Sequence, residues 1–382
     1  MEVSGVSKKR LIKGVTFIVV LCLLVGMVVA LNSQEAFCDG QQKEKQVKIM
    51  PMPQRKILSA EALPAELKYV ELQWIQGEDK VVVNLRTSIE ILDINTGKRE
   101  KVLEIKNVYD WPSISSDGRN VIFTELIPYE RSETYIYNLK GKKKEFISKG
   151  IVEGINWSPD GRYVVYTRLN KEVYVFDVEE GKSKKILESD FWDPELLGGE
   201  FDVPKWLPKS NKISILTNEG LCVMNPDGTD LRRISNEVPG NYQWFPDEKR
   251  ICFASGGGVF ILDIEKNIRT KIGKASDHPR YIPMDDLSLS PDGKKVAYHY
   301  AIFGPEDPYE DERRPPPQGD SEIYIYDVET KETVNITNTP NQLEEFPRWS
   351  SDGKRIICKV DESFFDGECW REVRIPIVIE VK

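Results

Sequence analysis

Histidine is scarce in this chain of 382 residues, which contains only His278 and His299. Protein sites for zinc draw their ligands from several histidines and cysteines, so the scarcity excludes a His-rich metal site. The acidic segment 306–312 could offer oxygen atoms to Ca²⁺, but it lacks the ordered spacing and internal glycine of a calcium loop and fits a solvated charge run better. We therefore expect no metal and no other cofactor.

Positive charge is also in the minority, because 53 Lys and Arg residues face 62 Asp and Glu residues and the formal net charge is −9. Nucleic-acid binding depends on clustered Lys and Arg side chains that neutralise phosphates. We therefore expect no nucleic-acid partner. The Gly-x-Ser-x-Gly pentapeptide of the α/β-hydrolases is absent as well, and no other set of catalytic residues stands out, so we do not expect an enzyme.

Cysteine is limited to six residues. Cys222, Cys252 and Cys358 lie in apolar segments and are expected to pack as small hydrophobic side chains. Cys358 and Cys369 flank one predicted hairpin and could form a disulfide in an oxidising compartment. The sequence leaves that pairing open.

Long hydrophobic runs are represented by one segment, the 17 uncharged residues from Val15 to Leu31. Basic residues precede the run and acidic residues follow it, which places the N-terminus inside and the rest of the chain outside a membrane. Residues 1–31 are therefore predicted to be a hydrophobic helix that serves as a retained anchor or as a signal peptide cleaved near Ala30. Residues 32–53 are predicted to be a flexible tether, and either alternative makes residues 54–382 membrane-anchored facing outward, secreted or periplasmic.

A repeated motif organises the rest of the chain. Its clearest copy is Trp157-Ser158-Pro159-Asp160-Gly161, followed by a β-branched and aromatic segment. Pro-Asp-Gly is turn chemistry and the segment after it has strand character, so the unit predicts a tight hairpin. The first residue of each copy, called the head here, is expected to fill the space between neighbouring units. The seven heads are Trp74, Ile114, Trp157, Trp206, Trp244, Leu289 and Trp349.

Each copy continues with a second pair of strands, such as 173–177 and 184–187 after the Trp157 hairpin. Four strands repeated every 40 to 45 residues are typical of a β-propeller blade. The sequence predicts an all-β fold, a seven-bladed propeller of four-stranded blades over residues 54–382. The seventh unit has three strands, and Arg55-Lys56-Ile57-Leu58 resembles a fourth strand, so we expect this N-terminal segment to close the ring.

The repeated Trp-Ser-Pro-Asp-Gly motif resembles the WD40-like (PD40-type) repeat of TolB-like propellers. The motif is strongest at Asp117-Gly118, Asp160-Gly161, Asp292-Gly293 and Asp352-Gly353. The resemblance implies the propeller fold, and its implied role is binding.

Long insertions are predicted to gather on one rim of the ring, because blade connections alternate between two rims. They comprise residues 188–202, 273–286, 303–320 and 361–370, with a shorter one near 128–131. Loops of this length in a compact domain are often functional, and exposed aromatic and Arg side chains suit recognition. The candidate binding residues are Phe191, Trp192, Asp193, His278, Arg280, Tyr281, Tyr309, Arg313, Arg314, Phe365 and Trp370.

The expected function is therefore an extracytoplasmic binding module for a protein, peptide or glycan of the cell envelope. One alternative is a propeller enzyme, a polysaccharide lyase or a hydrolase that uses rim residues such as Asp193 and His278. Another is a structural scaffold whose partner is a further subunit.

Overall fold

Seven hairpins carry the repeat in one common register. The structure, a computed structural model, describes residues 48–49, 55–57, 71–109, 112–127, 132–168, 172–188, 204–217, 220–236, 242–255, 257–274, 287–302, 320–339, 342–365 and 370–381. In each hairpin the head pairs with the residue seven positions later. The pairs are Trp74 with Val81, Ile114 with Val121, Trp157 with Val164, Trp206 with Ile213, Trp244 with Ile251, Leu289 with Val296 and Trp349 with Ile356.

The Ser-x-Asp-Gly turns are held by side-chain hydrogen bonds. The Ser158 hydroxyl donates to Asp160 (2.5 Å) and accepts the Tyr163 N–H (2.8 Å), while Asp160 also accepts the Arg162 N–H (3.0 Å). The turns at Ser115, Ser290 and Ser350 repeat the serine–aspartate bond. These aspartates therefore have a structural role, as expected.

Five separate antiparallel sheets contain four strands each. They are β3 (Glu71–Trp74), β4 (Lys80–Asn84), β5 (Ser88–Asp93) and β6 (Arg99–Glu104); β7 (Ser113–Ile114), β8 (Asn120–Glu125), β9 (Glu133–Asn138) and β10 (Lys143–Lys149); β11 (Glu153–Trp157), β12 (Tyr163–Arg168), β13 (Glu172–Asp177) and β14 (Lys182–Glu188); β15 (Lys205–Trp206), β16 (Ile213–Thr217), β17 (Gly220–Met224) and β18 (Arg232–Ser235); and β19 (Tyr242–Trp244), β20 (Arg250–Ser255), β21 (Gly258–Asp263) and β22 (Ile268–Lys274).

The remaining nine strands form one sheet. They are β23 (Leu287–Leu289), β24 (Lys295–Ile302), β25 (Asp320–Asp327), β26 (Thr333–Asn335), β27 (Leu343–Trp349), β28 (Arg355–Phe365) and β29 (Trp370–Glu380), with β1 (Lys48–Ile49) and β2 (Arg55–Ile57). The expectation of seven separate four-stranded sheets is therefore wrong, since five are separate. The physical reason is a parallel bridge between Ser321 of β25 and Leu343 of β27, which joins two runs of strands into one sheet.

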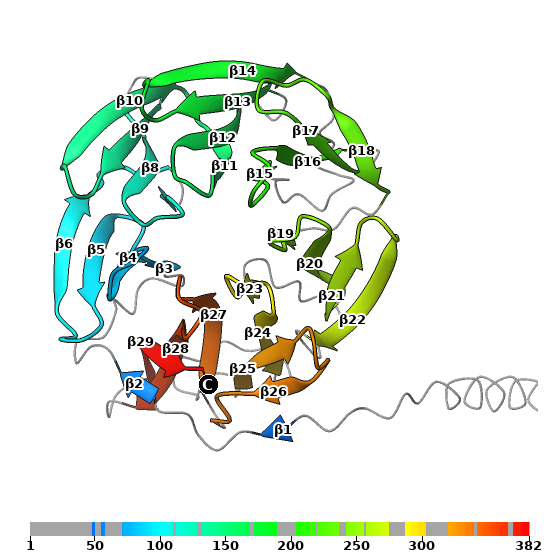
Figure 1. Cartoon of the computed structure of the whole chain (residues 1–382). Coiled ribbons are helices and arrows are strands. Elements are labelled where there is room, and N and C mark those ends of the chain that lie inside the picture. Colours follow the sequence, from blue (N-terminus) through cyan, green and yellow to red (C-terminus); the bar gives the residue numbers. More distant parts are fainter. Residues whose placement is uncertain are drawn as a thin grey trace, which may run out of the picture. The chain divides into compact units, whose positions relative to one another are not determined.

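The sheets follow one another around a ring, and in each four-stranded sheet the first strand lies near the centre and the fourth on the outer wall (Figure 1). The apolar core lies between successive sheets, as where Val82 and Ile89 pack with Val121 and Phe123. Gly118 shows how closely the sheets approach. Its φ is 72°, and a Cβ there would lie 2.9 Å from the Ile75 Cα of the preceding sheet, so only glycine fits.

Three of the tryptophan heads, Trp74, Trp157 and Trp244, join neighbouring sheets by hydrogen bonds as well as by packing. The Trp157 indole N–H donates to the Ser113 hydroxyl (3.2 Å), and the Trp244 indole donates to the Ser214 hydroxyl (2.8 Å). Burial of an indole is favourable when its N–H finds an acceptor. The expected placement of the heads between units is confirmed.

Ring closure by the N-terminal strand is also confirmed. β2 pairs antiparallel with β29, with Lys56 opposite Val378. Between the nine-stranded sheet and the β3–β6 sheet, the Trp74 indole donates to the Arg348 carbonyl (3.1 Å) and Arg355 donates to Asp79 (2.7 Å). Lys48–Ile49, inside the segment predicted as a tether, forms β1 and pairs in parallel with β26.

The described residues contain strands and turns, and no helix among them could cross a membrane. The hydrophobic run 15–31, for which a helix is predicted, lies outside the described residues. Residues 48–382 form one compact unit. Cys222, Cys252 and Cys358 are buried in its strands, as expected, whereas Cys369 lies outside the described residues.

Candidate functional site at the loop-bearing edge

The connections at the two ends of the strands differ in each sheet. The repeat turns and the turns between third and fourth strands lie at the same end, called here the short-turn edge. The opposite edge, the loop-bearing edge, is where second strands end and third strands begin. Strands β14, β22, β24 and β28 end there at Glu188, Lys274, Ile302 and Phe365, at the starts of the predicted insertions.

Most predicted binding residues lie outside the described residues. These are Phe191, Trp192, Asp193, His278, Arg280, Tyr281, Tyr309, Arg313 and Arg314. Phe365 ends β28 and Trp370 begins β29, and the two are Cα partners at the end of the longest hairpin. Their role in binding remains a prediction.

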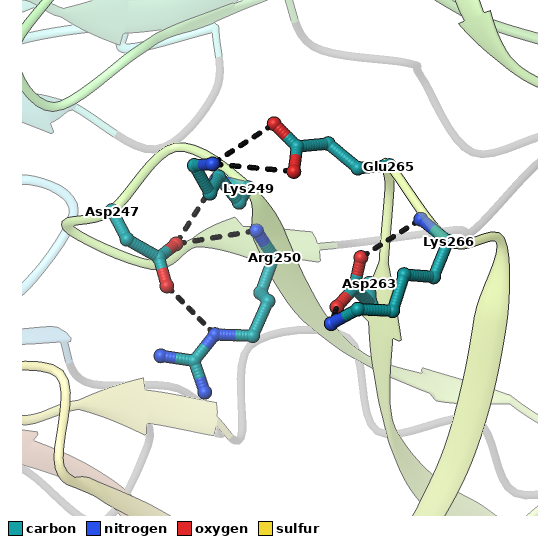
Figure 2. A network of polar contacts seen from close by, with 6 residues as sticks. All are labelled: Asp247, Lys249, Arg250, Asp263, Glu265 and Lys266. Atoms are coloured by element: carbon teal, nitrogen blue, oxygen red, sulfur yellow. Dashed lines mark hydrogen bonds and ion pairs between the residues drawn. The ribbon is translucent and has the colours of Figure 1, made fainter.

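The charged contacts around the turns of the β19–β22 sheet, at the short-turn edge, are exposed and local. Figure 2 shows Lys249 paired with Glu265 (3.0 Å) and Arg250 paired with Asp247 (2.7 Å). Lys266 pairs with Asp263 (2.7 Å) in the adjacent turn. Exposed ion pairs of this kind contribute about 0–1 kcal/mol each to stability, and this network is explained by turn stabilisation.

Near the loop-bearing edge, ionisable side chains are buried instead of exposed. The residue ten positions after each head lies near this edge on the second strand, and all seven are buried. They are Asn84, Thr124, Thr167, Leu216, Ala254, His299 and Lys359. The ionisable members, His299 and Lys359, both belong to the nine-stranded sheet.

Lys359 is a buried cation, with its side chain only 2% exposed. Its ammonium lies 2.8 Å from the Glu345 carboxylate and 5.2 Å from the centre of the Phe346 ring. The His299 ring meets the same Phe346 ring edge to face, with centroids 6.5 Å apart. Phe346 therefore packs between the two ionisable residues.

Two buried carboxylates lie at neighbouring strand positions, because Glu322 is the Cα partner of Tyr300, next to His299, and Glu344 is the partner of Val360, next to Lys359. We define the charged cluster as the residues His299, Glu322, Glu344, Glu345 and Lys359. Glu344 is fully buried and Glu322 is nearly so. The Thr339 backbone N–H donates to Glu322 (2.6 Å), and the Thr339 hydroxyl donates to Glu344. One threonine therefore links both carboxylates.

The inner strand β27 is distorted at the cluster. Its register with β28 shifts between Glu345 and Arg348, and Phe346 has a φ of 57°. A positive φ at a bulky residue is unfavourable and persists only where its surroundings enforce it, often at functional sites. The bulge sets Phe346 against His299 and Lys359.

Chemically, the cluster offers buried carboxylates, an ammonium and an imidazole below a loop-bearing surface. Among the described residues, no group of three or more His, Cys, Asp or Glu side chains is arranged to hold a metal ion. Buried charges cost folding free energy unless they are paired, and such groups concentrate where proteins bind or react.

Sequence reasoning did not identify most of this cluster. The candidate binding residues predicted from the sequence include none of its five members, and His299 enters there only as one of the two histidines. The signal was present in the repeat itself, because alignment on the heads places His299 and Lys359 at a position that is uncharged in the other five copies.

Comparison with known proteins gives distant relatives. No family model matches the chain. An uncharacterized protein of Agrobacterium fabrum is 22% identical over 199 residues, covering 50% of this chain and 61% of the relative. Dipeptidyl-peptidase 5 of Porphyromonas endodontalis is 23% identical over 286 residues, covering 58% of this chain and 38% of the relative. The chain thus matches less than two thirds of the length of either relative.

Solved structures share the fold. An oligogalacturonate lyase of Vibrio parahaemolyticus is 13% identical, covers 89% of this chain and 95% of its own, and has a TM-score of 0.52. A chain of the mitotic checkpoint complex is 11% identical, with coverages of 87% and 94% and a TM-score of 0.53. TolB of Acinetobacter baumannii is 15% identical, with coverages of 80% and 78% and a TM-score of 0.42. With its ring of five four-stranded sheets and one nine-stranded sheet, the chain is therefore a β-propeller, the fold that the repeated motif predicted.

Proposed function

We propose that this chain is a binding module that holds a protein, peptide or glycan at its loop-bearing edge, above the charged cluster. We also propose that the nine-stranded sheet counts as two blades, which makes seven. The observation that carries the function is the burial of His299 and Lys359 at positions where the other five repeats have uncharged residues.

Stability alone is a weak explanation for this arrangement. Replacing a buried ion pair with apolar side chains of similar volume is often neutral or stabilising, by about 1–4 kcal/mol. The equivalent positions in two other sheets are filled by Leu216 and Ala254, so the propeller accommodates apolar residues there. A binding role explains why the nine-stranded sheet retains Lys359, Glu345 and the strained Phe346.

The proposed location is outside the cytoplasm, with residues 15–31 as an anchor or a cleaved signal. Basic residues before that run and acidic residues after it motivate the proposal. Mass spectrometry of the protein isolated from cell envelopes tests cleavage. Recovery of the chain only from the cytosol would contradict the location.

An enzyme remains the second candidate, because buried groups such as His299 and Glu344 can also serve proton transfer. The solved relatives include an oligogalacturonate lyase, which shows only that this fold can host catalysis. Turnover of a polysaccharide or peptide that is abolished in His299→Gln would favour this candidate.

Glycan and peptide arrays probed with the full chain test the binding role. We expect a defined class of spots to be bound, and the double variant Glu345→Leu/Lys359→Met to lose that signal while remaining folded. The matched control is Lys249→Gln/Glu265→Gln, which removes an exposed ion pair at the short-turn edge (Figure 2). Arrays without bound spots, or equal binding by both variants, would refute the proposal.

A further inference from the structure

Part of the outer wall of the ring is strongly basic. Four successive outermost strands, β10, β14, β18 and β22, contain eleven Lys and Arg residues and two Glu residues. The chain as a whole has more acidic than basic residues. Figure 1 shows these strands following one another along the outside of the ring. We call this surface the basic outer wall.

Many of these side chains reach solvent. Lys182, Lys184, Arg232 and Lys271 are exposed. Some positive charge is offset locally, as where Lys144 pairs with Glu125 (2.6 Å). Lys143 pairs with Glu145 (2.7 Å), and Lys185 pairs with both Glu188 (2.5 Å) and Glu172 (3.4 Å). These three glutamates and Glu125 are fewer than the eleven basic residues of the four strands.

Protection of sheet edges explains only part of this pattern. Lysines on edge strands hinder edge-to-edge pairing with other chains. However, β6 is also an outermost strand and carries two basic and two acidic residues, so protecting the edge of a sheet does not require an excess of positive charge. The wall also keeps exposed apolar side chains at Phe146 (49%) and Ile268 (54%), which edge protection would remove.

The geometry points to a flexible linear polyanion. A planar membrane could touch only neighbouring strands of a curved wall, whereas the basic residues extend over four sheets (Figure 1). Duplex DNA has a persistence length of about 50 nm and resists wrapping a ring of this size. Single-stranded nucleic acid is bound through several aromatic platforms, and Phe146 is the exposed aromatic side chain among the described residues of these strands.

We propose that the basic outer wall binds an anionic polysaccharide, with Lys and Arg contacting its charged groups and Phe146 and Ile268 packing on its sugar rings. This site is separate from the charged cluster. Its ligand can therefore be tested whether or not the loop-bearing edge binds anything.

The test uses the full chain and dextran sulfate, with unsulfated dextran of the same length as the neutral comparison. The variant Lys182→Gln/Lys184→Gln/Arg232→Gln/Lys271→Gln removes four charges from the wall. Lys98→Gln/Lys106→Gln/Lys331→Gln/Lys354→Gln removes four exposed charges elsewhere and is the matched control. Binding is measured by calorimetry at several salt concentrations.

We expect salt-dependent binding of dextran sulfate and none of dextran. The wall variant should lose at least about tenfold in affinity and show a shallower salt dependence, because fewer counterions are released. The control should bind as the wild type does. Equal losses in both variants would overturn the proposal. So would equal binding of single-stranded DNA, or binding to vesicles of phosphatidylglycerol without binding to dextran sulfate.

Discussion

Serine hydroxyls control the ionisation of the turn aspartates at the scale of single residues. The Ser158 hydroxyl donates to the Asp160 carboxylate and lowers its pKa, and Ser290 and Ser350 do the same for Asp292 and Asp352. A carboxylate whose pKa is lowered by folding contributes stability above its ordinary pKa. That contribution is lost as the pH falls through the lowered value.

The lowered pKa values predict how a variant with neutral asparagine at these three positions responds to acid. In Asp160→Asn/Asp292→Asn/Asp352→Asn, the unfolding midpoint should fall less between pH 7 and pH 3 than in the wild type. Thermal unfolding followed by circular dichroism measures the difference. An unchanged fall in the triple variant would contradict the assignment.

At the scale of elements, the N-terminal strand completes the nine-stranded sheet. β2 covers three residues near the end of β29, because Arg55, Lys56 and Ile57 pair with Ile379, Val378 and Ile377. Without β2, the N–H and C=O groups on the outer side of these residues would be unpaired. We infer that β2 contributes directly to the stability of the ring.

Proline in β2 tests this contribution. Alternate N–H groups of a strand point to its partner, so Arg55→Pro/Lys56→Pro removes a ladder donor whichever residue faces β29. The free energy of unfolding should fall by about 1–3 kcal/mol, measured by urea denaturation. Gln41→Pro/Gln42→Pro, within the predicted tether, is the control. If both variants unfold at the same urea concentration, β2 does not support the ring.

At the scale of the whole molecule, the repeat made the fold predictable. Pro-Asp-Gly turns and the heads fix local hairpins, and their spacing predicts sheets that stack around a ring. The joined nine-stranded sheet was not predictable in this way. It depends on a single parallel bridge between Ser321 of β25 and Leu343 of β27, outside the hairpins that the repeat specifies. Strand β1 was missed because Lys48–Ile49 is too short to show strand periodicity.

The candidate site was harder to predict for a physical reason. His299 and Lys359 lie 60 positions apart, and their relation through Phe346 arises from a bulge in β27 that has no local sequence signature. The sequence predicted long connections from the spacing of the repeats, but it did not predict that His299 and Lys359 are buried. The proposed function therefore combines a prediction and an observation: long connections predicted from the sequence at one edge, and a buried charged cluster near the strand ends at that edge.

Hydrogen exchange of the full chain, with and without the glycan or peptide that binds it on the arrays, tests this account most directly. Binding should slow exchange in peptides that cover residues 299–322 and 343–372, at the loop-bearing edge of the nine-stranded sheet. Peptides covering residues 245–268, which contain the turns of Figure 2, should exchange as before. Slowed exchange confined to those turns, with none at residues 299–322 or 343–372, would contradict the account.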